Sequence, residues 1–301
     1  MTRVVRTNAE LREALAPERR AGRTIALVPT MGALHDGHLA LLRAARERCD
    51  VVVMSLFVNP AQFRPGEDLD AYPRDEARDL ALAEAERVDI VYAPEVTEVY
   101  PEGFATTVEV GGGLTDVLDG DPSRRGPEHF RGVTTVVAKL LNTVGPDFAF
   151  FGQKDAQQAV VLRRMIRDLD FAVEVAVVPT VREPDGLAMS SRNAYLEPEE
   201  RERAAALSRA LAAAARVAES GARSTAEALD AAREELAAAG VEPEYLEALD
   251  AESLEPMTSF NGRPVLVAVA ARVGRARLID NVVIQVRRSG AKPSRAAVEA
   301  P

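Results

Sequence analysis

Cysteine and long apolar runs are what this chain of 301 residues most conspicuously lacks. Its single cysteine, Cys49, excludes an internal disulfide and a multi-cysteine zinc site, and it fits a reducing compartment. No apolar stretch approaches the roughly 20 residues of a membrane helix, and Met1-Thr2-Arg3 does not begin a signal peptide. These absences predict a cytoplasmic protein with no membrane partner.

Basic residues are fewer than acidic residues, 37 against 47, so the formal net charge is −10. This balance disfavours a general nucleic-acid binder, because neutralising phosphates needs a basic face. Lysine occurs only at positions 139, 154 and 292, and histidine only at 35, 38 and 129. Arginine supplies the remaining Lys and Arg positions. A position that keeps lysine is therefore a mild indication that lysine has a specific role there.

Apolar runs alternate with helical periodicity from Thr24 to about Val181. We expect strands at 25–28, 51–58, 89–93, 106–110, 147–151 and 173–179, and helices at 38–48, 74–87, 131–144 and 155–168. Such alternation is typical of an α/β fold whose parallel sheet is covered on both faces. In these sheets, ligands bind beyond the carboxyl ends of the strands.

The pattern changes after Pro184-Asp185-Gly186. Helical stretches at 197–219 and 224–239 precede two strand-like runs, 264–273 and 276–286, which Gly274-Arg275 joins as in a hairpin. We therefore predict a larger domain over 1–180, a smaller α+β domain over 181–287, and a frayed tail over 288–301.

Residues 29–38 read PTMGALHDGH and lie where a strand ends and a helix begins. The two glycines permit close approach of a ligand, and the helix N-terminus attracts phosphate. His35 and His38 can face the same anion across the turn. A strand–helix turn with two surface histidines would also match this short pattern, but the flanking residues favour a phosphate site.

Two further segments carry groups that suit phosphates. Met189-Ser190-Ser191-Arg192 offers two hydroxyls and a guanidinium, although alone it could be a helix N-cap. Lys154 stands at the start of an expected helix, where the helix dipole disfavours a cation unless an anion is bound. Together with His-x-Gly-His, the 189–192 segment resembles the nucleotidylyltransferase superfamily, in which both motifs flank ATP.

Several longer motifs follow one another in a recognisable order. They are PTMGALHDGH at 29–38, FVNPAQF at 57–63, DLDAYPR at 68–74, HFRGV at 129–133, FGQKDAQQ at 151–158 and DGLAMSSRN at 185–193. On these motifs the chain resembles the pantoate–β-alanine ligase (pantothenate synthetase) family from about residue 3 to 287. The loop that precedes His129 is longer than the family's usual run, Gln153 replaces a frequent Glu, and Ala156 replaces an aromatic residue.

The resemblance implies that pantoate and β-alanine are joined to give pantothenate through a pantoyl-adenylate, with ATP and Mg2+, releasing AMP and pyrophosphate. It also implies a Rossmann-like nucleotidylyltransferase domain, a smaller carboxy-terminal lid domain and a homodimer. His38 would be the proton donor, with His35 and Lys154 as further catalytic residues. Gln62 would contact pantoate and β-alanine, Gln158 would contact pantoate, and Asn59 and His129 would also bind substrate. The ATP site would comprise Met31, Gly32, Ala33, Leu34, His35, Asp36, Gly37, His38, Gly152, Gln153, Lys154, Asp155, Val181, Met189, Ser190, Ser191 and Arg192.

Other interpretations remain open at this point. A nucleotidylyltransferase that adenylates a phosphate would share the fold, and a catalytically silent nucleotide-binding module would share the shape. The 59–63 and 152–158 segments argue against the first, and the complete set of cations and hydroxyls argues against the second. Acidic charge and a small second domain disfavour a synthetase acting on tRNA. We expect magnesium to be held largely by ATP phosphates, and Asp68, Asp70, Asp75 and Asp79 to form a solvated acidic loop.

Overall fold

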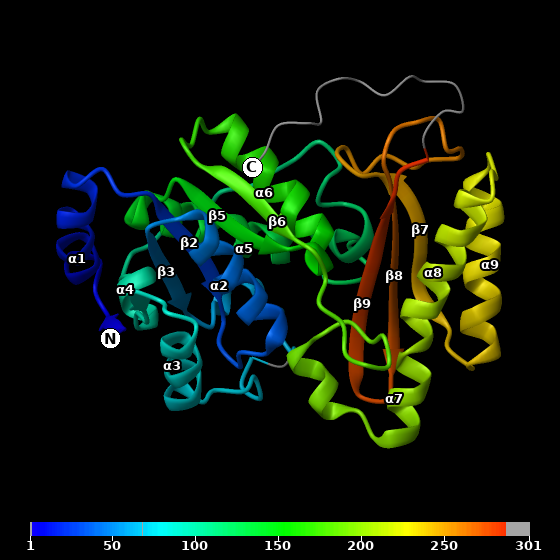
Figure 1. Cartoon of the computed structure of the whole chain (residues 1–301), viewed down its shortest axis with the longest axis horizontal. Coiled ribbons are helices and arrows are strands. Elements are labelled where there is room, and N and C mark those ends of the chain that lie inside the picture. Colours follow the sequence, from blue (N-terminus) through cyan, green and yellow to red (C-terminus); the bar gives the residue numbers. More distant parts are fainter. Residues whose placement is uncertain (1, 68, 287–301) are drawn as a thin grey trace.

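Six parallel strands form the larger sheet, in the order β1-β4-β3-β2-β5-β6. Figure 1 labels β3, β2, β5 and β6 of this sheet. The computed structural model describes residues 2–67 and 69–286. The strands are β1 (Arg3–Val5), β2 (Ile25–Thr30), β3 (Val51–Leu56), β4 (Ile90–Tyr92), β5 (Phe148–Gly152) and β6 (Glu174–Val178).

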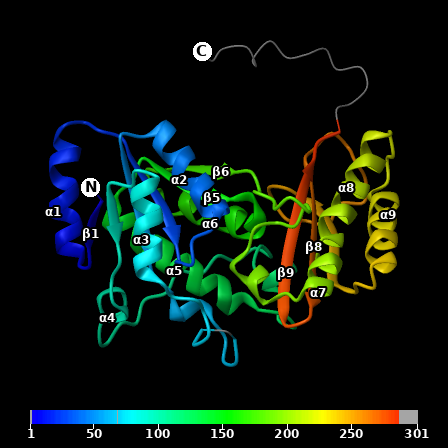
Figure 2. The same cartoon turned by 60° about the horizontal axis from the view of Figure 1, so that its bottom comes forward.

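Successive residues of β2 face opposite sides of this sheet, as the two-residue period of a strand requires. Ile25 and Leu27 belong to a core that includes α1 (Asn8–Arg20), α5 (Pro127–Val144) and α6 (Ala156–Asp168). Ala26 and Val28 belong to a second core, with α2 (Asp36–Arg48) and α3 (Glu76–Ala85). Helices therefore cover both faces (Figure 2), and the predicted α/β fold is confirmed.

The strand order reverses direction between β2 and β5, which is the switch point of the sheet. The chain builds β3, β4 and β1 on one side of β2, and β5 and β6 on the other. Pairing with β5 involves Ala26 and Leu27, whereas pairing with β3 continues to Thr30. Pro29 lies in this terminal part of β2, where it has no amide hydrogen to donate to β5. A crevice at such a switch point is where α/β sheets bind ligands.

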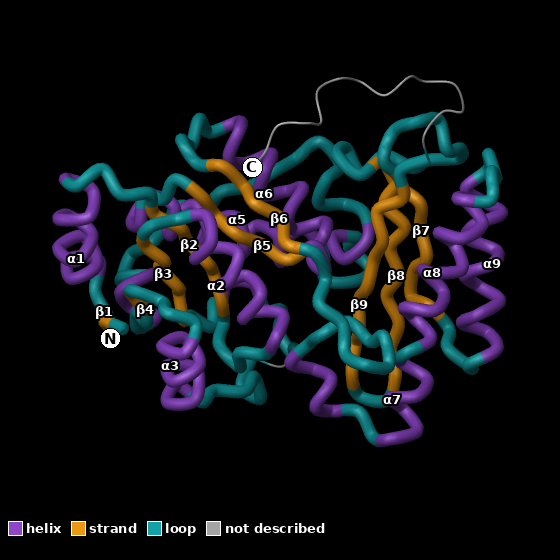
Figure 3. Tube along the Cα trace, in the orientation of Figure 1, coloured by secondary structure: helices purple, strands orange, loops and turns teal. Residues whose placement is uncertain are grey.

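The smaller sheet is antiparallel, in the order β7-β8-β9, and forms the second group of strands in Figure 3. Its strands are β7 (Pro243–Asp250), β8 (Val265–Val273) and β9 (Ala276–Ile284), and the expected hairpin joins the last two. α8 (Ala206–Glu219) and α9 (Thr225–Ala238) cover one face. The other face contributes Tyr245, Leu249 and Leu266 to the core of α5 and α6.

Several expected boundaries are wrong. The stretch 106–110 is not a strand, because buried threonines of α5 satisfy its backbone: the Val108 amide donates to the Thr135 hydroxyl, and the Thr134 hydroxyl donates to the Val108 carbonyl. The helix expected over 197–219 is divided at Ala205 into α7 (Pro198–Ala204) and α8. The sequence analysis missed β1, α1 and β7. Short elements not anticipated are α4 (Val96–Val99), η1 (Pro60–Gln62), η2 (Leu118–Gly120), η3 (Gln153–Asp155) and η4 (Ser191–Tyr195).

The proposed division of the chain near residue 180 stays a prediction; it falls in the loop after β6. The tail predicted over 288–301 lies outside the described residues. Over the parts of the chain that the structure describes, no helix combines the length and hydropathy needed to cross a membrane.

Candidate active site

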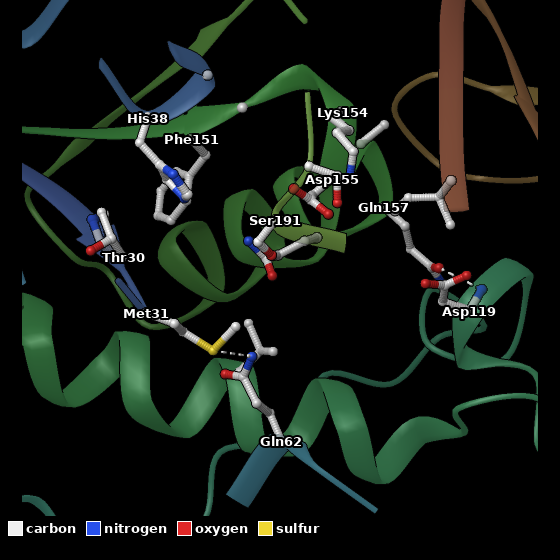
Figure 4. A pocket seen from close by; sticks show the side chains of 18 of the residues that line it. Thr30, Met31, His38, Gln62, Asp119, Phe151, Lys154, Asp155, Gln157 and Ser191 are labelled. Atoms are coloured by element: carbon white, nitrogen blue, oxygen red, sulfur yellow. Dashed lines mark hydrogen bonds between the residues drawn. The ribbon is translucent and has the colours of Figure 1, made fainter. Parts of the chain in front are cut away.

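A cavity of about 280 Å3 lies at the crevice between β2 and β5. The larger sheet supplies Pro29 and Gly152 at its strand ends, and the smaller sheet closes one side with Asp280 and Asn281. His38, Gln62 and Lys154 approach the cavity from α2, η1 and η3 (Figure 4). Three segments far apart in sequence, 29–38, 151–158 and 189–192, therefore surround one space.

Most residues predicted for the site line this cavity. They are Met31, His35, Gly37, His38, Asn59, Gln62, His129, Gly152, Lys154, Asp155, Gln158, Val181, Met189, Ser190, Ser191 and Arg192. The cavity lining does not include Gly32, Ala33, Leu34, Asp36 or Gln153, so their contact with ATP stays a prediction. Leu34 is a core residue, Asp36 is exposed on the first turn of α2, and the Gln153 amide donates to Asn281.

The turn over Gly32, Ala33 and Leu34 points away from the cavity because Asp79 holds it. The Asp79 carboxylate, 1% exposed on α3, accepts the amides of Ala33 at 2.9 Å and Leu34 at 2.8 Å. Gly32 has φ +82°, and an added Cβ would lie 2.8 Å from the same carboxylate. The prediction that Asp79 belongs to a solvated acidic loop is therefore wrong, since it is a buried anchor.

His35 and His38 cap α2 together. The Nδ1 atom of His35 accepts the Gly37 amide at 3.2 Å, and the Nδ1 atom of His38 accepts the His35 amide at 3.4 Å. Their ring centroids are 4.1 Å apart. Because both Nδ1 atoms accept, each neutral ring carries its proton on Nε2. Both imidazoles thus offer an N–H donor.

Burial keeps these two histidines neutral. It lowers the pKa of His38 to about 3, with His35 and Lys154 adding to the shift. Burial, followed by the charge of Lys154, lowers the pKa of His35 to about 4. The sequence analysis predicted that both rings face the same anion. As neutral rings they would contact it as hydrogen-bond donors, and bound phosphate charge would raise both pKa values.

Lys154 supplies positive charge to the cavity. Its ammonium forms no ion pair with any residue in 2–67 or 69–286. The Ser190 hydroxyl accepts the Arg192 amide at 3.3 Å, so Ser190 is the N-cap of η4 as well as a lining residue. The capping interpretation of this motif and its phosphate-binding interpretation are therefore compatible.

Gln62 is held in place by buried Asn59. The Asn59 amide donates to Gln62 Oε1 at 3.0 Å and to the Gly132 carbonyl at 3.1 Å, while its own oxygen accepts the Tyr100 hydroxyl at 2.7 Å. Gln62 in turn donates to the Met31 sulfur at 3.2 Å. Asn59 is 1% exposed and has its polar atoms occupied, which favours a positioning role over direct substrate binding.

His129 is likewise engaged within the chain. Its Nδ1 donates to the Gln62 carbonyl at 2.7 Å, and its Nε2 lies 3.2 Å from an Arg125 nitrogen, which donates to it. Burial, then the Arg125 charge, lowers the pKa of His129 to about 4. Both ring nitrogens of His129 are thus engaged within the chain, and its contact with a substrate stays a prediction.

The sequence analysis missed a polar group at one end of the cavity. Asp119 accepts the Tyr245 hydroxyl at 3.0 Å and the Arg277 guanidinium at 2.9 Å. Gln157 accepts the Asp119 amide at 3.1 Å (Figure 4) and donates to the Leu114 and Val117 carbonyls. The side chain of its neighbour Gln158 has no hydrogen-bond partner in the described chain and lines the cavity. Only Gln158 of this pair is thus available to a ligand.

Asp75 and Asp79 of the expected acidic loop are engaged within the chain. Asp79 accepts backbone amides, and Asp75 accepts the Arg78 amide as the N-cap of α3. Within the described ranges, no three His, Cys, Asp or Glu residues are grouped so as to hold a metal ion.

A histidine-capped helix at the switch point of a parallel sheet, facing an ammonium and two serines, defines a nucleotide-binding α/β enzyme. Comparison with known proteins is more specific. The sequence model of the family described as pantoate-beta-alanine ligase matches residues 3–283. The chain belongs to the pantoate–β-alanine ligase family.

Relatives with this name are similar over nearly their whole length. A pantothenate synthetase of Moorella thermoacetica is 53% identical over 284 residues, covering 94% of this chain and 99% of that protein. The crystal structure of pantothenate synthetase from Thermus thermophilus is 52% identical, with a TM-score of 0.87, and covers 93% of this chain and 99% of that one. A Francisella tularensis pantoate-beta-alanine ligase, complexed with beta-gamma ATP and β-alanine, is 29% identical, with a TM-score of 0.76, and the match covers 94% of this chain and 98% of that one.

Proposed function

We propose that this chain is the ligase that joins pantoate and β-alanine, using ATP to form a pantoyl-adenylate and releasing AMP and pyrophosphate. The observation that carries the proposal is the common cavity of the 29–38, 151–158 and 189–192 segments. The ATP and β-alanine bound to the Francisella tularensis relative support the same substrates here.

Adenylation has to overcome repulsion between a carboxylate and the α-phosphate. At about 4 Å and an effective dielectric near 20, each pair of unit charges repels by roughly 4 kcal/mol. That is nearly a thousandfold in rate, since about 1.4 kcal/mol is tenfold. Lys154 and Arg192 line the cavity and offset this repulsion, and the Nε2–H groups of His35 and His38 donate to phosphate oxygens. His38 is the proposed proton donor once phosphate charge has raised its pKa.

Amide transfer needs the acyl group to be held beside the β-alanine amine. Gln62 and Gln158 each offer a donor and an acceptor to a substrate that carries hydroxyls and a carboxylate. The bond from Asn59 fixes the orientation of Gln62. Attack of the amine on the mixed anhydride then forms the amide and expels AMP, with no protein nucleophile required.

Magnesium, a homodimer and a cytoplasmic location complete the proposal. Because the described residues offer no three-ligand cluster, the ion would be bound by the ATP phosphates and water, as is common for Mg2+. Its chemistry would be to neutralise phosphate charge. Light scattering on the purified chain tests the dimer, and a titration of magnesium against the adenylation rate tests the metal requirement.

An ATP–pyrophosphate exchange assay tests the function directly. We expect exchange that requires pantoate, and AMP formation that requires β-alanine in addition. Exchange driven by a phosphorylated acceptor in place of pantoate would favour a different nucleotidylyltransferase. Absence of exchange with pantoate would contradict the proposal and favour a silent nucleotide-binding module.

A further inference from the structure

Two adjacent residues of β9, Asp280 and Asn281, connect the smaller sheet to both loops predicted to hold ATP. Their side chains are only 3% and 5% exposed, and both residues line the cavity. They lie outside every motif that identified the site in the sequence. Their partners, however, lie within or next to those motifs.

Asn281 holds the segment that carries Lys154. Its Nδ2 donates to the carbonyls of Gln153 at 2.9 Å and Lys154 at 2.8 Å, and its Oδ1 accepts the Gln153 amide at 3.0 Å. A primary amide is the side chain that can donate twice and accept once in this way. Asn281 therefore fixes the backbone from which the Lys154 ammonium projects.

Asp280 holds the loop that carries residues 189–192. Its two carboxylate oxygens accept the Arg182 guanidinium at 2.6 and 3.0 Å. Arg182 also donates to the Gly186 carbonyl at 3.1 Å, and its backbone pairs with Ala188. Arg182 thus closes the turn that directly precedes Met189. The Asp280 carboxylate also accepts the Asn281 amide at 2.8 Å, so the two anchors form one unit.

We propose that Asp280 and Asn281 are positioning residues for adenylation, which set the spacing between Lys154 and the 189–192 segment. The inference rests on the proposed function. Correct placement of reacting groups is worth orders of magnitude in rate, and a displacement of about 1 Å can cost about 100-fold. One strand that contacts both segments maintains this placement, because neither segment can shift without breaking its hydrogen bonds to Asp280 or Asn281.

Asn281→Ala and Asp280→Asn test the proposal by steady-state kinetics and pyrophosphate exchange. We expect kcat/KM for ATP to fall by about 10- to 100-fold, while KM for β-alanine stays unchanged. If Asp280→Asn does not fold, Arg182→Lys tests the same link, because it keeps the charge and loses the two-pronged contact.

Asp250→Asn is the matched control. Asp250 lies on β7 of the same sheet, is 5% exposed and pairs with Arg263 at 2.9 Å, yet it is not a lining residue. We expect this variant to lose thermal stability and keep its kcat/KM for ATP. The inference would be overturned if Asn281→Ala kept its ATP kinetics and if Asp280→Asn, or Arg182→Lys in its place, did so too. The contacts would then be merely structural. A wild-type chain without exchange would instead contradict the proposed function itself.

Discussion

At the scale of single residues, the charge of Lys154 is the simplest feature to test. Because its ammonium has no carboxylate partner in the described chain, Lys154→Ala should leave folding intact. We expect adenylation to slow by at least about 100-fold, a loss of roughly 3 kcal/mol. Lys139→Ala is the control, since Lys139 contacts the Phe104 ring at 4.7 Å and does not line the cavity. Near-normal pyrophosphate release by Lys154→Ala would remove that residue from the mechanism.

The protonation of the histidines can be measured directly, because the chain has only three. Burial lowers the pKa of His35 and His129 to about 4, and that of His38 to about 3. We expect all three ring resonances in NMR spectra of the free protein to remain those of neutral imidazole down to about pH 5. A midpoint near the ordinary value of about 6.5 for His38 would contradict its burial beside His35 and Lys154.

Site residues that stand in short sequence motifs could be predicted from the sequence. Residues whose role depends on partners far away in the chain could not. His35, His38, Lys154 and Ser190 stand in short motifs at strand ends or helix starts. Asn281, by contrast, meets Gln153 across 128 sequence positions. A contact between residues so far apart in the chain cannot be predicted from the sequence of one protein.

At the scale of elements, α3 and β2 meet through Asp79, which supports the turn after β2. Asp79→Ala would leave the buried amides of Ala33 and Leu34 without acceptors, at a cost of about 2 to 4 kcal/mol. We expect a lower urea midpoint and a higher KM for ATP, because the turn leads into the histidine pair.

Asp75→Ala separates this effect from the loss of a helix cap. Asp75 lies on the exposed side of the same helix terminus and accepts the Arg78 amide at 3.0 Å. Its removal should cost about 1 kcal/mol without changing KM for ATP. Equal effects of the two substitutions on KM would refute a specific role for Asp79.

The sequence analysis mispredicted these elements for different reasons. α1 has a readable signal, since Thr7 and Glu10 form a capping box. β7 lacks one: it is covered on both faces, so its side chains do not alternate between apolar and polar. The run 106–110 has the composition of a strand, but threonines of α5, near in space and distant in sequence, satisfy the Val108 backbone.

At the scale of the whole molecule, the lowered pKa values of the three histidines make stability depend on pH. Above about pH 6.5 these rings are neutral in both states. As the pH falls, the unfolded chain binds protons that the folded chain does not, so stability decreases until the folded pKa of about 4 or 3 is reached. For His129 alone the loss is about 2 kcal/mol by pH 5.

Urea unfolding at about pH 7.5 and about pH 5 measures this dependence. His129→Asn keeps an N–H donor and cannot titrate, so its stability should fall less between these conditions. The same slope in the variant and the wild type would assign the dependence to other groups.

Tyr245, Leu249 and Leu266 of the smaller sheet share one core with α5 and α6. A fragment that stops near residue 180 would leave the apolar surface of those helices facing water, and it would associate with itself instead of binding nucleotide. Exchanging one half of the chain for that of a relative would also change this core, because residues of both halves pack in it. We therefore expect neither half of the chain to bind nucleotide or to be active by itself.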